Sequence, residues 1–391
     1  MRTQVGIVGA GPAGLLLSFL LRRAGIDCVV LENRSRRYVI ERVRAGLLEQ
    51  GTVDLVNELG LGERLRREGL VHHGLELRFG GKSHRIALTE LTGKTVTIYG
   101  QNELVTDLID ARLGCGGALM FEAEATGVEG FDGSTPRIRF RHDGRDDVLD
   151  CDFVAGCDGF HGICRPILEP VLTLYDREYP FGWLGVLSES PPVNDELIYV
   201  NHERGFALFT MRSRSISRLY LQCVPDEDID NWPDARIWEE LHLRLGDGNG
   251  HTLVEGRVLQ KGVTPMRSFV AAPMRHGRLF LAGDAAHIVP PTGAKGLNLA
   301  VADVRVLAAA LAEFYKSGSP QLIDGYSDIC LRRVWKAQRF SWWMTSMLHR
   351  FDDQLPFDRR VQQAELDYVT GSRAGATSLA ENYVGLPFED V

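Results

Sequence analysis

Three glycines near the start of the chain have the spacing of a phosphate-binding turn. Gly9, Gly11 and Gly14 follow a short apolar run at residues 4–8 and open a stretch with helical periodicity. In such a turn the first glycine makes the bend, the second lets the backbone approach a pyrophosphate, and the third lets helix and strand pack closely. Glu32, at the end of the next apolar run, can accept a hydrogen bond from a ribose hydroxyl. The pattern predicts a βαβ unit that binds a dinucleotide, and it leaves FAD and NAD open.

A second motif, in the last third of the chain, favours a flavin. An apolar strand at residues 278–282 runs into a Gly-Asp pair, and a Pro- and Gly-rich turn then leads into a long Ala-rich helix. Asp284 can accept from a sugar hydroxyl, and N–H groups at the helix start can stabilise a ring that becomes anionic on reduction. The residues at that helix start are Lys295, Gly296, Leu297 and Asn298. Because an isoalloxazine is such a ring, we expect tightly and non-covalently bound FAD.

Residues 206–224 have the alternation of a β-hairpin with a Ser/Arg turn. The two-residue period places Thr210 and Arg212 on one face of the first strand, and Arg218 and Tyr220 on one face of the second. A hydroxyl, a guanidinium and a phenol then converge, which suits a small carboxylate held by Arg212 in a bidentate pair. An exposed polar face is the other interpretation of this hairpin.

A third motif, Cys-Asp-Gly at residues 157–159 followed by Arg165, completes a set with the glycine turn and the Gly-Asp pair. With segments such as 181–185 and 381–387, this set resembles the single-component FAD-dependent aromatic hydroxylases over essentially the whole chain. The pattern of strands and helices and the resemblance imply an α/β fold. It consists of a Rossmann-like FAD domain with the GxGxxG turn, an inserted β-rich substrate domain and a C-terminal helical region.

The resemblance also implies which further residues hold the two dinucleotides. For FAD these are Arg42, Arg44, Gln101, Asp158 and Arg218, in addition to those named above. For a nicotinamide cofactor that binds transiently they are Arg34, Tyr38, Arg44, His161 and Arg267. The basic segment after Glu32 could meet a 2′-phosphate. We therefore expect NADPH and keep NADH as the alternative, with a solvated charged loop as the other interpretation of that segment.

The reaction implied by the resemblance is hydroxylation of 4-hydroxybenzoate at its 3-position with O2, the flavin carrying the oxygen as a C4a-hydroperoxide. Tyr199, Tyr383 and His72 correspond to a proton path from the substrate phenol to solvent, in which His72 would titrate near neutral pH. The backbone at Pro291 and Thr292 would shape the flavin face. The implied substrate-binding residues are Thr210, Arg212, Tyr220, Tyr199 and Pro291.

Three points stay open at this stage. Thr210 stands where the family usually has Ser, so the added methyl could change substrate breadth. The substrate could be a related phenolic acid, such as 3-hydroxybenzoate or 3,4-dihydroxybenzoate. The chain could also be a flavin-binding redox sensor without turnover, although the presence of Arg212, Tyr220 and the complete proton path argues against it.

The composition limits which binding partners and which cellular compartment we expect. A net charge of −8, from 44 basic and 52 acidic side chains, argues against a nucleic-acid binder. Seven cysteines without a C-x-x-C pair indicate neither a zinc site nor a disulfide framework and fit the reducing cytoplasm. The apolar run at residues 5–21 contains glycines and is too short to span a membrane, so we expect no membrane association.

Shifts in pattern along the chain predict its domains. We expect the FAD domain at 1–72 and 97–175, the β-rich substrate domain at 73–96 and 176–266, a return to the FAD domain at 267–297 and a helical region at 298–391. In that last region, residues 340–344 with Met347 and Leu348 form an aromatic helical stripe. Core packing and a homodimer contact both remain open for it.

Overall fold

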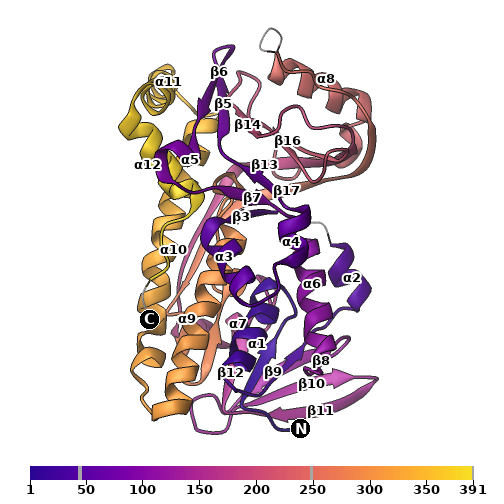
Figure 1. Ribbon diagram of the computed structural model, residues 1–391, viewed down its shortest axis with the longest axis vertical. Coiled ribbons are helices and arrows are strands. Elements are labelled where there is room, and N and C mark those ends of the chain that lie inside the picture. Colours follow the sequence, from indigo (N-terminus) through magenta and orange to yellow (C-terminus); the bar gives the residue numbers. More distant parts are fainter. Residues whose placement is uncertain (43–45, 247–249, 390–391) are drawn as a thin grey trace.

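The computed structural model describes residues 1–42, 46–246 and 250–389, which form two layered regions joined by long strands (Figure 1). The lower region in that view contains a six-stranded sheet in the order β18-β19-β12-β1-β2-β8. Its strands are β1 (Val5–Val8), β2 (Cys28–Leu31), β8 (Leu119–Met120), β12 (Phe153–Gly156), β18 (Arg275–His276) and β19 (Leu279–Leu281). All neighbours pair in parallel except β18 and β19. Every residue of β1, β2, β12 and β19 is buried, as in a parallel sheet covered on both faces.

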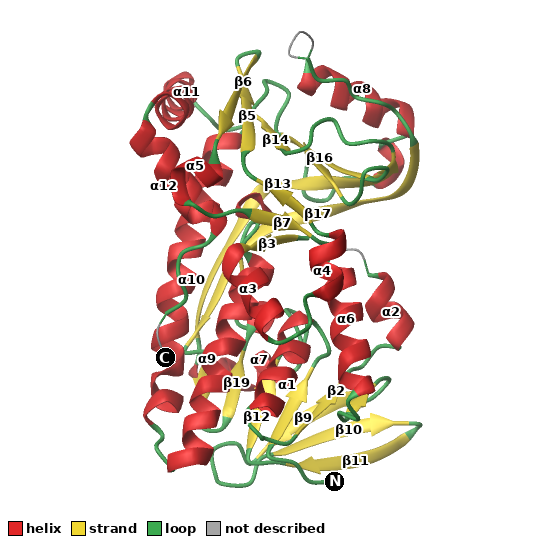
Figure 2. Cartoon of the chain, viewed as in Figure 1, coloured by secondary structure: helices red, strands yellow, loops and turns green. Residues whose placement is uncertain are grey.

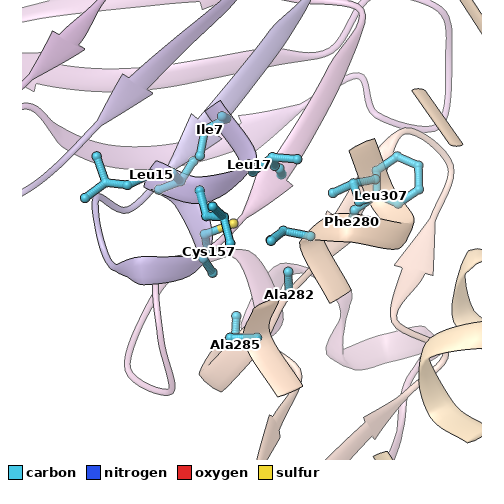
Figure 3. Packing of buried hydrophobic residues seen from close by; sticks show 14 of the residues in the cluster. Ile7, Leu15, Leu17, Cys157, Phe280, Ala282, Ala285 and Leu307 are labelled. Carbon is cyan, nitrogen blue, oxygen red and sulfur yellow. The ribbon is translucent and has the colours of Figure 1, made fainter. Parts of the chain in front are cut away.

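Helices and a small antiparallel sheet cover the two faces of this six-stranded sheet. Ile7 faces α1, where it approaches Gly14, whereas Gly6 points to the other face and approaches Ile138. The helices packed together on the first side are α1 (Pro12–Arg23), α6 (Gln101–Gly114) and α9 (Gly296–Ser317). The second side carries β9 (Glu124–Glu129), β10 (Arg137–His142) and β11 (Arg145–Asp150). Figure 3 shows the buried cluster around Ile7 and Leu15.

The upper region is built on an eight-stranded sheet in the order β20-β17-β13-β16-β15-β14-β5-β6 (Figure 2). Its strands are β5 (Leu75–Phe79), β6 (Lys82–Ile86), β13 (Thr173–Glu189), β14 (Leu197–Val200), β15 (Ala207–Met211), β16 (Ser217–Cys223), β17 (Arg257–Ala272) and β20 (His287–Ile288). One face packs on α8 (Asp234–Leu245) through residues such as Leu184 and Leu219. Alternate positions face the other way and carry Trp183, Tyr199, Thr210, Arg218 and Tyr220. The strand period therefore separates a packing face from a polar and aromatic face.

The long strands cross the boundaries expected from the sequence. β13 begins at Thr173 and β17 ends at Ala272, so both run through the expected domain limits near 176 and 266. Segment 73–96 contributes β5 and β6 to the eight-stranded sheet. A fourth sheet lies at the junction, made of β3 (Leu47–Glu49), β7 (Val96–Ile98) and β4 (Leu70–His72). The chain thus passes between the regions through continuous β-structure, and the exact division into domains stays a prediction.

Helices complete the C-terminal part, drawn orange to yellow in Figure 1. After α9 come α10 (Gln321–Leu348), α11 (Pro356–Gly371) and α12 (Arg373–Val384). The short helices elsewhere are α2 (Arg36–Glu41), α3 (Gln50–Glu58), α4 (Glu63–Glu68), α5 (Leu88–Thr92) and α7 (Cys164–Leu168). Within the described ranges, none of the helices combines the length and the apolar character needed to cross a lipid bilayer.

The aromatic stripe of α10 divides between core and surface. Phe340, Met344, Met347 and Leu348 are buried in one hydrophobic cluster, which confirms core packing for them. Trp342 is 45% exposed and faces away from that cluster. The homodimer interpretation therefore rests on the outer side of this helix and stays a proposal.

Candidate active site

The glycine turn between β1 and α1 is shaped as a cradle. Gly9 has φ +103°, and a side chain there would overlap the Cys157 carbonyl, whereas one at Gly14 would overlap the carbonyl of Gly9. A Cβ at Gly11 would meet no atom of the described chain within 4 Å. Gly11 is also the N-cap of α1 and provides no side-chain cap, so the first N–H groups of that helix remain available to a ligand. This arrangement fits the pyrophosphate of FAD.

Glu32 lies at the end of β2, directly beside this turn. It is 8% exposed, and its Oε2 accepts a hydrogen bond from the Ala10 N–H at 2.8 Å. Its Oε1 accepts from the Arg34 N–H at 2.9 Å. Each carboxylate oxygen has a second lone pair, so Glu32 keeps the capacity to accept a hydrogen bond from the expected ribose hydroxyl.

The Gly-Asp turn after β19 presents an acid to the same end of the sheet. Asp284 is exposed in the 3₁₀ turn Gly283–Ala285. Buried Asp303 of α9 fixes this turn, because its Oδ2 accepts from the Gly283 N–H at 2.9 Å and lies 2.6 Å from His287 Nε2. Burial opposes charge on His287, but Asp303 raises its pKa. Residues near Asp284 in the sequence do not indicate this support, because it comes from a separate helix.

The start of α9 can offer backbone groups to a flavin, but not every side chain there is available. Lys295 Nζ donates to Glu49 Oε1 at 2.7 Å, and both groups are buried. Asn298 Oδ1 accepts from the Glu49 N–H at 3.0 Å. The cofactor role expected for Lys295 and Asn298 is therefore limited to their backbone, next to the N–H groups of Gly296 and Leu297.

The other expected FAD residues are placed as follows. Gln101 is the first residue of α6. Asp158 Oδ2 accepts from the Cys164 N–H at 2.9 Å, whereas its buried Oδ1 has no hydrogen-bond partner among the described residues. Burial raises the pKa of Asp158. Arg42 is exposed, and Arg44 lies outside the described residues.

The predicted hairpin is present as β15 and β16, and it brings its polar side chains together. Thr210 lies directly opposite Arg218 in the antiparallel register. Arg218 Nε donates to the Tyr220 hydroxyl at 3.2 Å. The Thr210 Oγ1 is buried and has no hydrogen-bond partner among the described residues. A buried hydroxyl without a partner is costly, so this atom marks a place for a polar ligand.

Two guanidinium groups set the charge of this face. Arg212 follows β15 directly, and Arg212 and Arg218 both hydrogen-bond the Tyr220 phenol. Burial alone would raise the pKa of Tyr220, but the two arginines lower it. Burial lowers the pKa of Arg212. A carboxylate placed here would offset two positive charges with little solvent screening.

Two of the three residues of the expected proton path are joined. The Tyr199 and Tyr383 hydroxyls lie 2.7 Å apart, and both side chains are almost fully buried. Their rings meet edge to face at 6.1 Å. Burial raises the pKa of both phenols, so each stays an O–H group that can donate and accept.

His72 does not complete this path by direct contact. It lies on β4, is 1% exposed, and neither of its ring nitrogens has a hydrogen-bond partner among the described residues. Burial lowers the pKa of His72 to about 4. The expectation that His72 titrates near neutral pH is therefore wrong, because desolvation disfavours the imidazolium.

The residues expected to bind the nicotinamide cofactor form two groups. In one, the Arg34 guanidinium lies 5.3 Å from the Tyr38 ring centroid; Arg42, which is expected to hold FAD, lies 5.9 Å from the same ring. In the other, His161 and Arg267 both approach Phe160, at 5.1 and 5.0 Å. Arg267 is also ion-paired with Asp176 and Glu178. Their joint role in binding one ligand stays a prediction.

The turn Pro291–Gly293 precedes α9 on the flavin side. Pro291 is exposed and Thr292 is fully buried. The Thr292 hydroxyl is hydrogen-bonded to that of Thr345 in α10 at 3.0 Å. This contact anchors the turn from behind and leaves its other side accessible.

Sequence reasoning missed several residues behind the polar face. Gly185, Trp183 and His349 all pack close to Tyr220 or to its neighbours. A glycine inside the strand pattern of β13 was a usable signal for Gly185, since it often marks a close approach. Nothing in the local sequence distinguishes His349 from an ordinary helix-end histidine.

A cofactor cradle of the FAD type, together with a buried, cationic and phenolic sheet face, is the combination that a flavin-dependent aromatic hydroxylase needs. A family model described as the FAD binding domain matches residues 2–341. The chain is also 52% identical over 391 residues to the p-hydroxybenzoate hydroxylase of Acinetobacter baylyi, covering 100% of this chain and 96% of that protein. The chain belongs to the FAD-dependent aromatic hydroxylase family and is a flavoprotein monooxygenase.

More distant relatives are named for other aromatic substrates. A 3-amino-4-hydroxybenzoate 2-monooxygenase from Streptomyces cremeus is 26% identical, covering 86% of this chain and 85% of that protein. A 3-(3-hydroxy-phenyl)propionate/3-hydroxycinnamic acid hydroxylase from Mycobacterium is 27% identical over 86% of this chain, which spans 57% of that protein. The crystal structure of p-nitrophenol 4-monooxygenase from Pseudomonas putida superposes with a TM-score of 0.83 at 21% identity, covering 99% of each chain. At this identity the superposition establishes the fold alone.

Proposed function

We propose that this enzyme hydroxylates 4-hydroxybenzoate at carbon 3, with NADPH as the electron donor. The observation that carries the proposal is the sheet face on which Thr210, Arg212, Arg218 and Tyr220 converge. Two cations, a phenol and an unpartnered hydroxyl match the charge and the hydrogen-bonding capacity of a benzoate carboxylate. The identity to the Acinetobacter baylyi relative supports the same substrate.

The proposed reaction balances with one flavin turnover. 4-Hydroxybenzoate, O2, NADPH and a proton give 3,4-dihydroxybenzoate, NADP⁺ and water. One oxygen atom forms the new ring C–O bond, and the other leaves as water with the two electrons that NADPH supplies. Bound FAD supplies the redox and oxygen chemistry, so the chain must bind, orient and deprotonate the substrate and keep water out.

The chain's own residues divide these tasks between the two ends of the substrate. Arg212, Thr210 and Tyr220 would hold the carboxylate, and Arg218 would place positive charge beside the flavin. The Tyr199 hydroxyl would take the proton of the substrate phenol while it gives its own to Tyr383 through their 2.7 Å hydrogen bond, and Tyr383 would release a proton in turn toward solvent, so both tyrosines stay neutral. Removing that proton makes the ring a stronger nucleophile, which is general base catalysis through a short hydroxyl chain.

In this proposal FAD binds at the glycine-turn cradle, and NADPH binds at two clusters that contain arginines. FAD would lie along the Gly9 turn, Glu32, Asp284 and the start of α9. NADPH would bind transiently at the clusters around Tyr38 and Phe160. The exposed guanidinium of Arg34 favours a 2′-phosphate, and NADH remains the alternative donor.

A substrate panel tests the proposal directly. Purified FAD-loaded enzyme is mixed with NADPH or NADH and with 4-hydroxybenzoate, 3-hydroxybenzoate, 3,4-dihydroxybenzoate or p-nitrophenol. Oxygen uptake, nicotinamide oxidation and product mass are followed together. We expect 4-hydroxybenzoate to give stoichiometric 3,4-dihydroxybenzoate. Tight coupling with another phenolic acid would assign that acid instead, and ligand binding without any stimulated oxidation would favour a redox sensor.

The proposed assembly is a homodimer in the cytoplasm. Trp335 and Trp342 lie two turns apart on α10 and are 44% and 45% exposed, so they offer an aromatic surface for a second copy. All seven cysteines are free thiols, which suits a reducing compartment. Light scattering of the wild type and of a Trp342→Glu variant tests the dimer, and a monomeric wild type would contradict it.

A further inference from the structure

Two buried aromatic side chains, Trp183 and Phe206, pack behind Tyr220, and we call them the aromatic wall. The Trp183 ring contacts the Tyr220 ring at 4.9 Å and stacks on Phe206 at 4.9 Å with an interplanar angle of 11°. Trp183 is 3% exposed and lies on the same face of the eight-stranded sheet as Tyr220. The orientation of the Trp183 indole therefore sets where Tyr220 can lie.

His349 fixes that indole by a single hydrogen bond. The Trp183 Nε1–H donates to His349 Nε2 at 2.7 Å, and His349 Nδ1–H donates to the Thr345 carbonyl at 3.0 Å. These two contacts define one neutral tautomer. The centroid of the His349 ring lies 4.6 Å from that of Phe181 and 4.3 Å from that of Phe206, so the imidazole is held between the two rings. His349 has no exposed surface.

The environment keeps His349 in this state. Burial lowers its pKa to about 3, so the imidazole stays neutral and Nε2 stays an acceptor. An acceptor for a buried indole N–H is valuable because an unpaired N–H keeps the full cost of its lost hydration. The aromatic partners on both sides also prevent the ring from turning away.

The same end of α10 holds the flavin-side turn. The Thr345 carbonyl accepts from His349, while the Thr345 hydroxyl is bonded to the Thr292 hydroxyl. Thr292, Thr345 and His349 are all 0% exposed. One rigid helix end thus contacts both the turn beside the flavin site and the wall behind the substrate site.

We propose that His349 is a positioning residue for the benzoate pocket: it orients Trp183, and through it Tyr220, relative to the flavin-side turn. The inference rests on the proposed function, since it concerns the same pocket. His349 also stacks on Phe206, which contacts Tyr199 at 6.2 Å, but its side-chain hydrogen bond toward the pocket is made to Trp183, so the proposed positioning acts through that bond.

A double-mutant cycle tests the proposal. His349→Phe keeps a flat ring between the two phenylalanines but removes the acceptor, and Trp183→Phe removes the donor. We expect His349→Phe to raise the dissociation constant for 4-hydroxybenzoate about tenfold, or ~1.4 kcal/mol. The constant is read from the change in flavin absorbance on titration. In the Trp183→Phe background the same substitution should change it less than about twofold, because the bond is already lost.

Further readouts separate positioning from general damage. KM should rise with the dissociation constant while kcat and the affinity for FAD stay within about twofold of wild type. His349→Gln, whose Oε1 can accept from the indole, should stay within about threefold of wild type. The matched control is Trp232→Phe: Trp232 is 3% exposed on the other face of the sheet, and its Nε1 has no partner among the described residues. This control should leave substrate binding unchanged.

Each result decides the proposal. A folded His349→Phe variant with unchanged binding, or with the same tenfold loss in both backgrounds, would overturn it. If His349→Phe does not fold, the other two variants decide. Weak 4-hydroxybenzoate binding by Trp183→Phe together with near-normal binding by His349→Gln supports the positioning role of His349. Near-normal binding by Trp183→Phe together with weak binding by His349→Gln overturns it. A wild-type enzyme that does not bind 4-hydroxybenzoate contradicts the proposed function instead, so the two failures are distinguishable.

Discussion

Gly185 occupies the position on β13 opposite Tyr220, and the Arg218 guanidinium fills the space that a side chain at Gly185 would need. A Cβ built there would lie 2.7 Å from Arg218 Nη2 and 3.2 Å from Tyr220 Cε1. The atom nearest to the clash is the far end of a flexible side chain. A methyl group at Gly185 would therefore move Arg218 without breaking the sheet.

Gly185→Ala should weaken 4-hydroxybenzoate binding about tenfold and increase the share of oxygen released as hydrogen peroxide, because Arg218 loses its place beside Tyr220. The melting temperature should fall by only a few degrees. The control is Gly262→Ala on β17, since Gly262 pairs with Gly185 and a Cβ there meets no atom of the described chain within 4 Å. Equal kinetics for Gly185→Ala and wild type would show that Arg218 does not depend on this space.

Tyr199→Phe should leave substrate affinity within about threefold of wild type while it lowers product yield per NADPH and raises peroxide release. The hydroxyl that pairs with Tyr383 at 2.7 Å is lost, but the buried ring keeps its packing. Oxygen uptake with and without catalase measures the peroxide. Tyr179→Phe on β13 is the matched control, because that hydroxyl bonds Ser268 instead. Normal coupling in Tyr199→Phe would remove the tyrosine pair from the proton path.

Stability should fall on mild acidification through His72. Its pKa in the folded protein, about 4, lies below the usual value of 6.5, so between these values the unfolded chain binds more protons. The effect is therefore absent above about pH 6.5 and grows as the pH falls toward 4. From pH 7 to pH 5 this one group should cost about 2 kcal/mol of the free energy of unfolding.

Urea unfolding at pH 7 and pH 5 checks this prediction in three proteins. His72→Asn should lose about 2 kcal/mol less than wild type between the two pH values, because an amide does not titrate. His73→Asn changes the exposed neighbour and serves as the control. An identical pH dependence for wild type and His72→Asn would mean that the buried imidazole is not held neutral.

Gly11→Ala should separate cofactor binding from folding. The position faces open space, so the apoprotein should fold normally, and the N-cap change should cost at most about 1 kcal/mol. The affinity for FAD, measured by fluorescence titration of apoprotein, should drop at least about tenfold because the methyl occupies the approach to the pyrophosphate. Gly114→Ala, at an exposed helix end with equally open surroundings, is the control. Unchanged FAD affinity in Gly11→Ala would place the pyrophosphate elsewhere.

Local periodicity accounts for what the sequence could predict. The glycine turn with its strand and helix, and the facing of Thr210, Arg218 and Tyr220, depend on neighbours a few positions apart, and the structure has them as expected. Patterns of this kind are visible without knowledge of tertiary contacts.

Tertiary partners account for what it could not predict. From the sequence, Lys295 at a helix start is predicted to bind the cofactor. In the structure its ammonium group pairs with Glu49, which is 246 positions away in the chain. His72 reads as a neutral-pH titrating group, and only burial in the folded protein lowers its pKa. His349 gives no local signal, because its role depends on Trp183, 166 positions earlier in the chain.

Thr210→Val should weaken substrate binding while the free energy of unfolding stays the same or rises. The Thr210 hydroxyl is buried without a partner among the described residues, so replacing it by a methyl of the same shape removes an uncompensated desolvation cost. The free energy of unfolding should stay the same or rise by about 1 kcal/mol. The dissociation constant for 4-hydroxybenzoate should rise several-fold, because the carboxylate loses a donor, whereas Thr210→Ser should bind nearly as wild type. Urea unfolding and flavin-absorbance titration measure the two effects. A valine variant that is less stable but binds normally would mean that the hydroxyl serves the fold, and the carboxylate would then depend on the arginines and Tyr220 alone.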